Sequence, residues 1–227
     1  MKIIDLFCGI GGLSLGFEQA GFEVVSAVDM WKDAIVTYNH NRKDKVAKVE
    51  TVEDFNEKEL PELVKSEHIT GIIGGPPCQG FSIAGKRIVN DDRNKLYKGF
   101  VRMVEYFKPK AFVMENVPNI LSIGDGAVRE TIINDFKSLG YTVETKVLTA
   151  SDYGVPQNRR RAVFVGLTKG NFDFDIPMVA EKVTTEEALS DLPEQSIEDG
   201  GKYSVESTSG YQKLMRINSI GVYNHEV

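Results

Sequence analysis

The chain has 227 residues, of which 41% are hydrophobic and 26% are charged, and its net charge is −6 at pH 7. These values are typical of a globular protein with one substantial core, and they argue against a protein that coats nucleic acid through overall positive charge. No apolar run approaches the roughly 18 residues that a membrane span needs, so we expect no membrane partner.

Strand-like and helical segments alternate along the first 167 residues. We expect strands at 2–7, 23–28, 45–50, 69–74, 111–115, 142–148 and 161–167. We expect helices at 11–20, 32–41, 56–65, 95–107 and 127–139. This alternation predicts an α/β fold with a mostly parallel sheet and helices on both faces, whose ligands bind beyond the carboxyl ends of the strands.

The character of the chain changes after Leu167. Residues 169–227 are polar, contain two clear breaks at 190–193 and 198–201, and show one short helical stretch at 185–189. We therefore expect a catalytic domain at 1–168 and a polar extension at 169–227 that is too thin for a second core.

The cysteines and histidines indicate the compartment and the class of site. Cys8 and Cys78 do not make a disulfide framework, and the first segment lacks a signal-peptide pattern, so we expect a cytoplasmic protein. The three histidines lack the spacing of metal ligands, so we expect no metal site.

Two loops beyond predicted strand ends indicate chemistry. A glycine-rich loop at 5–12 enters the first predicted helix, and Asp29 follows the second strand, which together favour an adenosine-containing cofactor. Cys78 follows the strand at 69–74 on a loop stiffened by Pro76 and Pro77. From position alone, Cys78 is either a nucleophile or a structural loop cysteine.

Charged residues beyond other strand ends have two interpretations each. Glu115 is either a solvated acid or a catalytic one. The run at 159–161 is three arginines, and residues 86–110 hold eight basic side chains against three acidic ones. Such runs are usually solvated surfaces, but here they lie near the expected ligand-binding edge, where they could face phosphate.

Four segments carry a resemblance. Residues 5–12, 75–82, 115–117 and 157–161 resemble the motifs of the cytosine-C5 DNA methyltransferases, in the same order and at similar spacing over the first 167 residues. The resemblance implies S-adenosylmethionine as methyl donor, with S-adenosylhomocysteine as product. It also implies a Rossmann-like methyltransferase fold, a seven-stranded sheet whose last strand is antiparallel, and a cytosine flipped out of double-stranded DNA.

The resemblance also implies roles for single residues. Cys78 corresponds to the thiolate that attacks C6 of cytosine, which makes C5 nucleophilic. Glu115 corresponds to the acid that binds N3 and the exocyclic amine, and Arg161, with Arg159 nearby, to the arginines beside the base. The loop at 82–94 matches the family's mobile DNA loop, and its expected DNA contacts are Ser82, Lys86 and Arg87.

The implied cofactor site gathers residues from several predicted strand ends. The matching positions are Phe7, Gly9, Gly11, Gly12, Asp29, Met30, Pro76 and Leu96, with Trp31 as a rival to Met30 against the adenine. Glu50 stands where the family usually has Asp at the end of the third strand, so the adenine contact there departs from the pattern.

The expected partner is double-stranded DNA. Family members continue into a target-recognition domain that residues 168–227 do not resemble, so we expect a fragment, or a subunit completed by a second polypeptide. Two alternatives stay open: a tRNA cytosine-C5 methyltransferase, whose motif usually continues differently from Gly80-Phe81-Ser82, and a non-catalytic module with the same fold.

Overall fold

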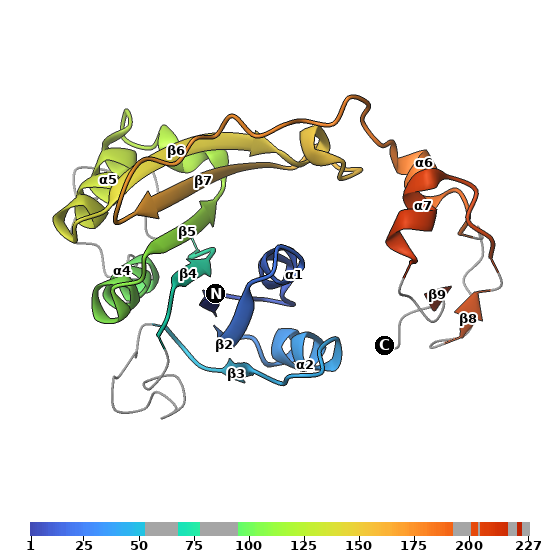
Figure 1. The fold of residues 1–227 in the computed structure, drawn as a ribbon, viewed down its shortest axis with the longest axis horizontal. Helices are drawn as coiled ribbons and strands as arrows, with labels where there is room; N and C mark the ends of the chain where they lie inside the picture. The colour runs from blue at the N-terminus through green and yellow to red at the C-terminus, as the bar shows by residue number, and fades with distance from the viewer. Residues whose placement is uncertain (53–67, 78–94, 193–200, 204, 218–221, 224–227) are drawn as a thin grey trace. The chain divides into compact units, whose positions relative to one another are not determined.

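The computed structural model describes residues 1–52, 68–77, 95–192, 201–203, 205–217 and 222–223 (Figure 1). The chain divides into two compact units. The first comprises Met1–Val147 and Arg161–Phe174, and the second comprises Leu148–Arg160 and Asp175–Val227. The expected boundary at residue 168 stays a prediction, because compactness alone does not tell which part binds a cofactor or DNA.

A seven-stranded sheet organises the fold. Its strands are β1 (Lys2–Leu6), β2 (Glu23–Asp29), β3 (Ala47–Val49), β4 (Gly71–Gly74), β5 (Ala111–Asn116), β6 (Thr142–Thr149) and β7 (Arg160–Leu167). The order across the sheet is β3-β2-β1-β4-β5-β7-β6. Strands β3, β2, β1, β4 and β5 pair in parallel, and β7 pairs antiparallel with β5. The predicted α/β fold with an antiparallel last strand in the sheet is therefore confirmed.

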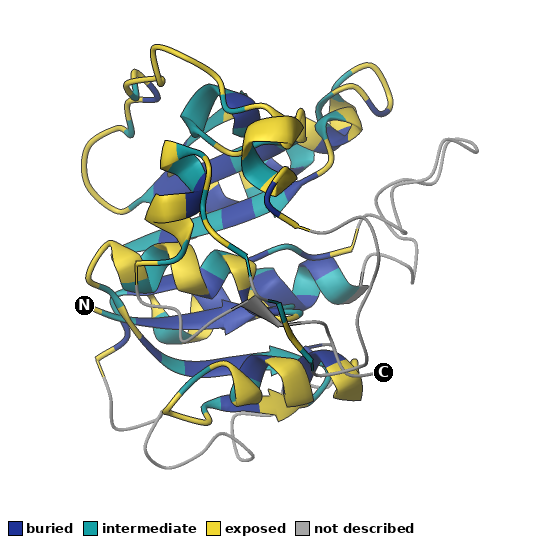
Figure 2. Ribbon diagram, turned by 90° about the vertical axis from the view of Figure 1, so that its right-hand side faces the viewer, coloured by how far each residue is buried: buried dark blue, intermediate teal, exposed yellow. Residues whose placement is uncertain are grey.

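Helices cover both faces of this sheet. They are α1 (Gly12–Gln19), α2 (Lys32–His40), α4 (Lys95–Phe107) and α5 (Ala127–Ser138), with the short 3-10 turn η3 (Pro118–Leu121). A second 3-10 turn, η4 (Ala150–Tyr153), belongs to the second compact unit. Because side chains alternate along a strand, Ile4 and Leu6 of β1 pack into a core with α4 and α5, whereas Ile3 packs into one with α1 and α2. Figure 2 shows the strands as the most continuously buried part of the fold.

The ends of the predicted elements differ by a few residues. The third strand is limited to Ala47–Val49 instead of 45–50, and β2 extends through Asp29. The helix predicted at 56–65 lies outside the described residues.

The polar extension holds more structure than its sequence pattern predicted. Besides α6 (Thr185–Leu189), it contains α7 (Gly210–Met215) and a two-stranded sheet of β8 (Lys202–Tyr203) and β9 (Val222–Tyr223). Each helix begins with a capping box, at Thr184 and at Ser209. Ser209 Oγ also donates to the Glu187 carbonyl at 2.6 Å, so polar contacts join the two helices.

Candidate active site

The glycine-rich loop between β1 and α1 is a tight turn fixed by backbone bonds. Gly11 N–H donates to the Cys8 carbonyl at 2.9 Å, and Cys8 N–H donates to the Val28 carbonyl at 3.1 Å. Gly9 and Gly11 have φ of +52° and +89°, and Phe7 has a φ of +61°. These left-handed conformations suit glycine and are uncommon for phenylalanine, so the turn concentrates strain at the carboxyl edge of the sheet.

Asp29 ties this loop to the next strand end. One carboxylate oxygen accepts from Gly9 N–H at 2.9 Å and the other from Trp31 N–H at 2.8 Å. Glu50 N–H donates to the Asp29 carbonyl at 3.0 Å, which brings the end of β3 to the same place. Each Asp29 oxygen accepts only one of these backbone bonds, so lone pairs remain for hydroxyl donors such as those of a ribose.

The surface around the loop fits an adenosine-containing methyl donor. A Cβ at Gly9 or at Gly12 would meet no atom within 4 Å, so both face open space. Met30 and Trp31 are 68% and 63% exposed directly after Asp29 and offer apolar surfaces to a flat base. Open backbone, a carboxylate and exposed apolar side chains together match the parts of S-adenosylmethionine.

Gly11 differs from the other loop glycines. It is buried, and a Cβ there would lie 2.5 Å from Arg42 Nη1 and 2.6 Å from Tyr38 Cδ2. Its carbonyl accepts from Arg42 Nη2 at 2.8 Å and also from Leu15 N–H at 3.0 Å in α1.

A buried polar chain lies beneath the loop. Tyr38 OH donates to Ser14 Oγ at 2.9 Å, and Ser14 donates to Asp5 Oδ2 at 2.5 Å. The other Asp5 oxygen is buried without a partner. Burial raises the pKa of Asp5 to about 7 and that of Tyr38 to about 12. Burial also raises the pKa of Cys8 well above its usual range, which agrees with a packing role for that thiol.

A second group of residues meets beyond β4 and β5. Arg161 Nε lies 3.2 Å from Glu115 Oε2, and both side chains are partly exposed. A Cβ at Gly75 would lie 2.9 Å from Glu115 Oε1, so the glycine permits the carboxylate to approach the loop after β4. The pairing of Leu6 with Gly74 sets this loop beside the glycine-rich one.

Asn116 fixes the loop after β4, a role that its place in the motif did not reveal. It is buried, donates from Nδ2 to the Pro76 carbonyl at 2.8 Å, and accepts from Val117 N–H at 2.9 Å. This contact joins residues 40 positions apart and holds the buried Pro76 two positions before Cys78.

Several predicted site residues are not part of these two groups. Cys78, Ser82, Lys86 and Arg87 lie outside the described residues. Arg159 belongs to the second unit and is exposed, and Leu96 is half-buried in the first turn of α4. Their roles stay predictions.

The described residues hold neither a membrane-spanning helix nor a cluster of metal-binding side chains. None of the helices there combines the length and the apolar character needed to cross a bilayer. No group of three or more His, Cys, Asp or Glu side chains in that part of the chain is placed to hold a metal ion.

Comparison with known proteins identifies the family. The sequence model of the family described as C-5 cytosine-specific DNA methylase matches residues 1–224. The chain belongs to this family. The predicted resemblance is thereby confirmed, and it extends into the polar region after residue 168.

Curated relatives are type II methyltransferases. Type II methyltransferase M.DdeI of Desulfomicrobium norvegicum is 41% identical, over 99% of this chain and 57% of its own length. Type II methyltransferase M.AgeI of Thalassovita gelatinovora is 36% identical, over 99% of this chain and 60% of its own. The chain thus spans about three fifths of these relatives.

Solved structures agree on the methylase fold. A protein described as a DNA modification methyltransferase encoded within an E. coli prophage superposes with a TM-score of 0.74 at 36% identity, over 91% of this chain and 59% of its own. The S. pombe Dnmt2 methyltransferase superposes with a TM-score of 0.63 at 22% identity, over 77% and 54%, which supports the fold alone.

Proposed function

We propose that this chain carries the catalytic part of a cytosine-C5 DNA methyltransferase. It transfers a methyl group from S-adenosylmethionine to C5 of a flipped-out cytosine in double-stranded DNA. The observation that carries the proposal is the Glu115–Arg161 pair, held against Gly75 three positions before Cys78.

Cys78 is the nucleophile of this proposal. Its thiolate forms a bond to C6 of cytosine, and the electron pair of the C5–C6 double bond moves to C5. When bound, S-adenosylmethionine supplies a methyl group attached to a positively charged sulfur, which C5 can attack. After transfer, the C5 proton leaves to water, the bond between Cys78 and C6 breaks, and the aromatic ring and the thiolate are restored.

Glu115 and Arg161 control the charge on the base. As Cys78 attacks, charge builds up in the ring, and a proton held between Glu115 and N3 neutralises it. Arg161 orients this carboxylate through Nε and lies beside the cytosine O2 in this proposal, with Arg159 as a second donor to this region.

The residues around the glycine-rich loop hold the cofactor in this proposal. Gly9, Gly12 and Phe7 border the methionine part, Gly11 shapes the turn, and Asp29 accepts from the ribose hydroxyls. Met30, or Trp31 in its place, covers the adenine. Glu50, Pro76 and Leu96 complete the cofactor pocket.

DNA is the preferred substrate for two reasons. The family model that matches is that of DNA methylases, and the curated relatives at 36–41% identity are type II methyltransferases. The likeness to Dnmt2 supports the fold alone. Ser82, Lys86 and Arg87 are the proposed DNA contacts.

Covalent trapping tests the proposal. The chain is mixed with S-adenosylmethionine and a duplex that carries 5-fluorocytosine, whose C5 fluorine blocks the final elimination, and the intact mass is measured. We expect a covalent adduct that maps to Cys78, and none with Cys78→Ser. A tRNA that carries 5-fluorocytosine is tested in parallel.

Each outcome separates the alternatives. An adduct with tRNA but not with duplex DNA would favour an RNA methyltransferase. No adduct from this chain alone would mark it as an incomplete part of the enzyme. No adduct with either substrate from the full-length protein, or from the chain combined with a complementary subunit, would contradict the proposal that these residues perform the reaction and would favour the non-catalytic module.

A further inference from the structure

We propose that Arg42 is a positioning residue for the cofactor loop: it fixes the turn at Gly11 and so sets the affinity for S-adenosylmethionine. The inference rests on the proposed cofactor site and deepens it. Arg42 follows α2 and is 31 positions from Gly11 in the sequence.

The Arg42 guanidinium is held by contacts of three kinds. Its Nη2 donates to the Gly11 carbonyl at 2.8 Å, and its Nε lies 3.2 Å from both carboxylate oxygens of Glu18 on α1. Its central carbon lies 3.9 Å from the centre of the Tyr38 ring. Only 11% of the side chain is exposed, so these contacts lie largely out of water. A charged donor in such a place bonds more strongly than a solvated one.

The contact at Gly11 acts on the start of α1. Gly11 is the N-cap of that helix, and no side chain caps it. Its carbonyl accepts both the first helical bond, from Leu15, and the bond from Arg42. Arg42 and Tyr38 also fill the space beside the Gly11 Cα. Arg42 and Tyr38 therefore hold the left-handed turn at Gly11, whereas the space beside Gly9 and Gly12 stays open.

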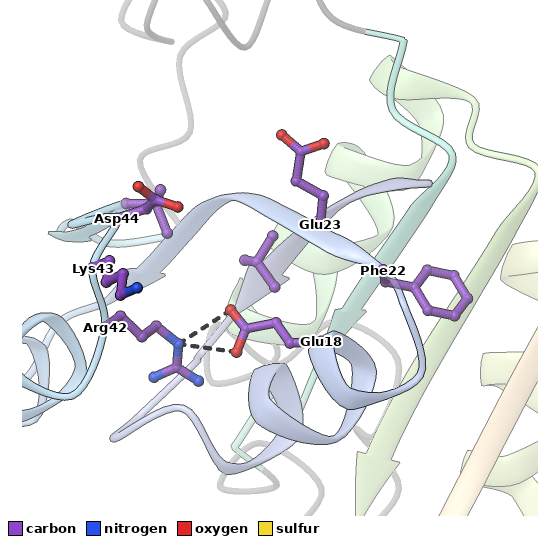
Figure 3. A pocket seen from close by; sticks show the side chains of 8 residues that line it. Glu18, Phe22, Glu23, Arg42, Lys43 and Asp44 are labelled. Atoms are coloured by element: carbon purple, nitrogen blue, oxygen red, sulfur yellow. Dashed lines mark hydrogen bonds and ion pairs between the residues drawn. The ribbon is translucent and has the colours of Figure 1, made fainter. Parts of the chain in front are cut away.

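The Arg42–Glu18 pair lines a pocket of about 270 Å³ (Figure 3). Glu23 and Val24 of this pocket begin β2, and Val46 directly precedes β3. The pocket thus lies at the amino ends of strands whose carboxyl ends carry Asp29 and Glu50. Arg42 links this pocket to the cofactor loop, because its guanidinium is directed at Glu18 in Figure 3 and its Nη2 donates to the Gly11 carbonyl.

Lysine cannot replace arginine in this place. The planar guanidinium donates in two directions and stacks on Tyr38, whereas an ammonium is a point charge on a flexible stem. Arg42→Lys keeps the positive charge but loses the planar group that donates in two directions and stacks on Tyr38. The variant therefore distinguishes a role in positioning the loop from a role that needs only a positive charge. Arg129→Lys is the matched control, because Arg129 forms an ion pair with Glu130 on α5.

The test uses two measurements on the full chain labelled with ¹⁵N-glycine. Amide exchange at Gly11 reports on the loop without any cofactor. Gly140 serves as the internal reference, because its N–H donates to the Lys137 carbonyl in the same way as Gly11 donates to Cys8. Calorimetric titration with S-adenosylhomocysteine then gives the affinity.

We expect Arg42→Lys to raise exchange at Gly11 and to weaken S-adenosylhomocysteine binding, each by about tenfold, the size expected for losing a charged hydrogen bond. Gly140 is expected to stay unchanged, as is the Arg129→Lys variant in both measurements. Glu18→Gln retains the Gly11 contact and is expected to raise Gly11 exchange only about threefold, which keeps the test available if Arg42→Lys fails to fold.

Unchanged exchange at Gly11 in Arg42→Lys would overturn the proposal, as would a tenfold rise in Glu18→Gln. Raised exchange with unchanged affinity would overturn the role in cofactor binding. If the unaltered chain bound no S-adenosylhomocysteine, the proposed cofactor site would fail, and the exchange rates would still decide whether Arg42 holds the loop.

Discussion

At the scale of single residues, the glycines of one loop meet different physical demands. Gly12 has ordinary backbone angles and faces open space, so only a ligand would require its lack of a side chain. Gly11 combines a φ of +89° with occupied space beside its Cα. Its demand for glycine therefore comes from the protein itself.

Alanine substitutions separate these demands. We expect Gly11→Ala to cost about 2 kcal/mol or more of unfolding free energy, from left-handed strain and overpacking. We expect Gly12→Ala to leave the unfolding free energy unchanged or slightly higher, because alanine favours the first turn of α1. We also expect it to weaken S-adenosylhomocysteine binding. Urea unfolding and calorimetric titration measure the two effects. A Gly12→Ala variant with unaltered affinity would contradict a cofactor over this residue.

The Glu115 carboxylate gives a second prediction. Glu115→Gln retains the shape of the side chain but cannot hold a proton for N3, so we expect covalent trapping on 5-fluorocytosine DNA to slow by about 100-fold or more. The melting temperature is expected to change little, because the side chain is partly exposed. Glu130→Gln, from the exposed pair on α5, is the control, and equal trapping rates in the two variants would exclude a catalytic role for Glu115.

At the scale of elements, the strand ends form the candidate site and Asn116 joins two of them. Its side chain crosses from the end of β5 to the loop after β4, so the Pro76 carbonyl has a fixed partner. Without that partner, a buried carbonyl would lose its hydrogen bond, and the loop that leads to Cys78 would lose its anchor.

Asn116→Ala is therefore expected to lower the unfolding free energy by about 1–3 kcal/mol. The rate of covalent trapping is expected to fall with it. Asn119→Ala, at an exposed position in η3, is the matched control and is expected to stay within about 0.5 kcal/mol of the unaltered chain. Equal stabilities of the two variants would show that the Pro76 contact contributes nothing measurable.

The main elements could be predicted because their signals are local. Apolar runs that end in glycine, proline or acid predicted the strands. Parallel pairing then predicted that the glycine-rich loop, Asp29, Cys78 and Glu115 lie at one edge. The two-residue strands β8 and β9 are too short for any periodicity. The signal for α7 was the Ser209 and Gln212 capping box, which the polar composition around it concealed.

The contacts of Asn116 and Arg42 could not be predicted in the same way. Asn116 bonds to a residue 40 positions away, and Arg42 to residues 24 and 31 positions away. Such partners depend on the complete fold, and in the sequence both residues resemble ordinary polar positions at an element's end. The motif at 115–117 marked Asn116 without indicating what it does.

At the scale of the whole molecule, burial of one acid makes stability depend on pH. Asp5 is fully buried in β1, and burial raises its pKa from 3.8 to about 7. Arg42 opposes this rise and Asp29 adds to it. The folded state therefore holds a proton that the unfolded state releases between these two pH values.

Because the pKa of Asp5 is higher in the folded state, protonated Asp5 contributes to stability. This contribution is fully present below pH 3.8 and is lost as the pH rises toward about 7. We expect the stability of the unaltered chain to fall relative to that of Asp5→Asn over this interval, by at most about 1.4 kcal/mol per pH unit. Urea unfolding of both chains at several pH values measures the difference, in which other titrating groups cancel. A constant difference would exclude titration of Asp5.

The crowding beside Gly11 also has a consequence for how such sequences diverge. A substitution at residue 11 is strained by the φ of +89° in any surroundings, and residues 38 and 42 add to its cost because they fill the space beside the Cα, whereas residue 12 is free of both. Mutational effects at 11, 38 and 42 are therefore coupled and do not add. A sequence that lost Arg42 would remove part of the steric crowding beside Gly11. The left-handed backbone angle would still favour glycine at residue 11, so we expect residue 42 to vary among related sequences before residue 11 does.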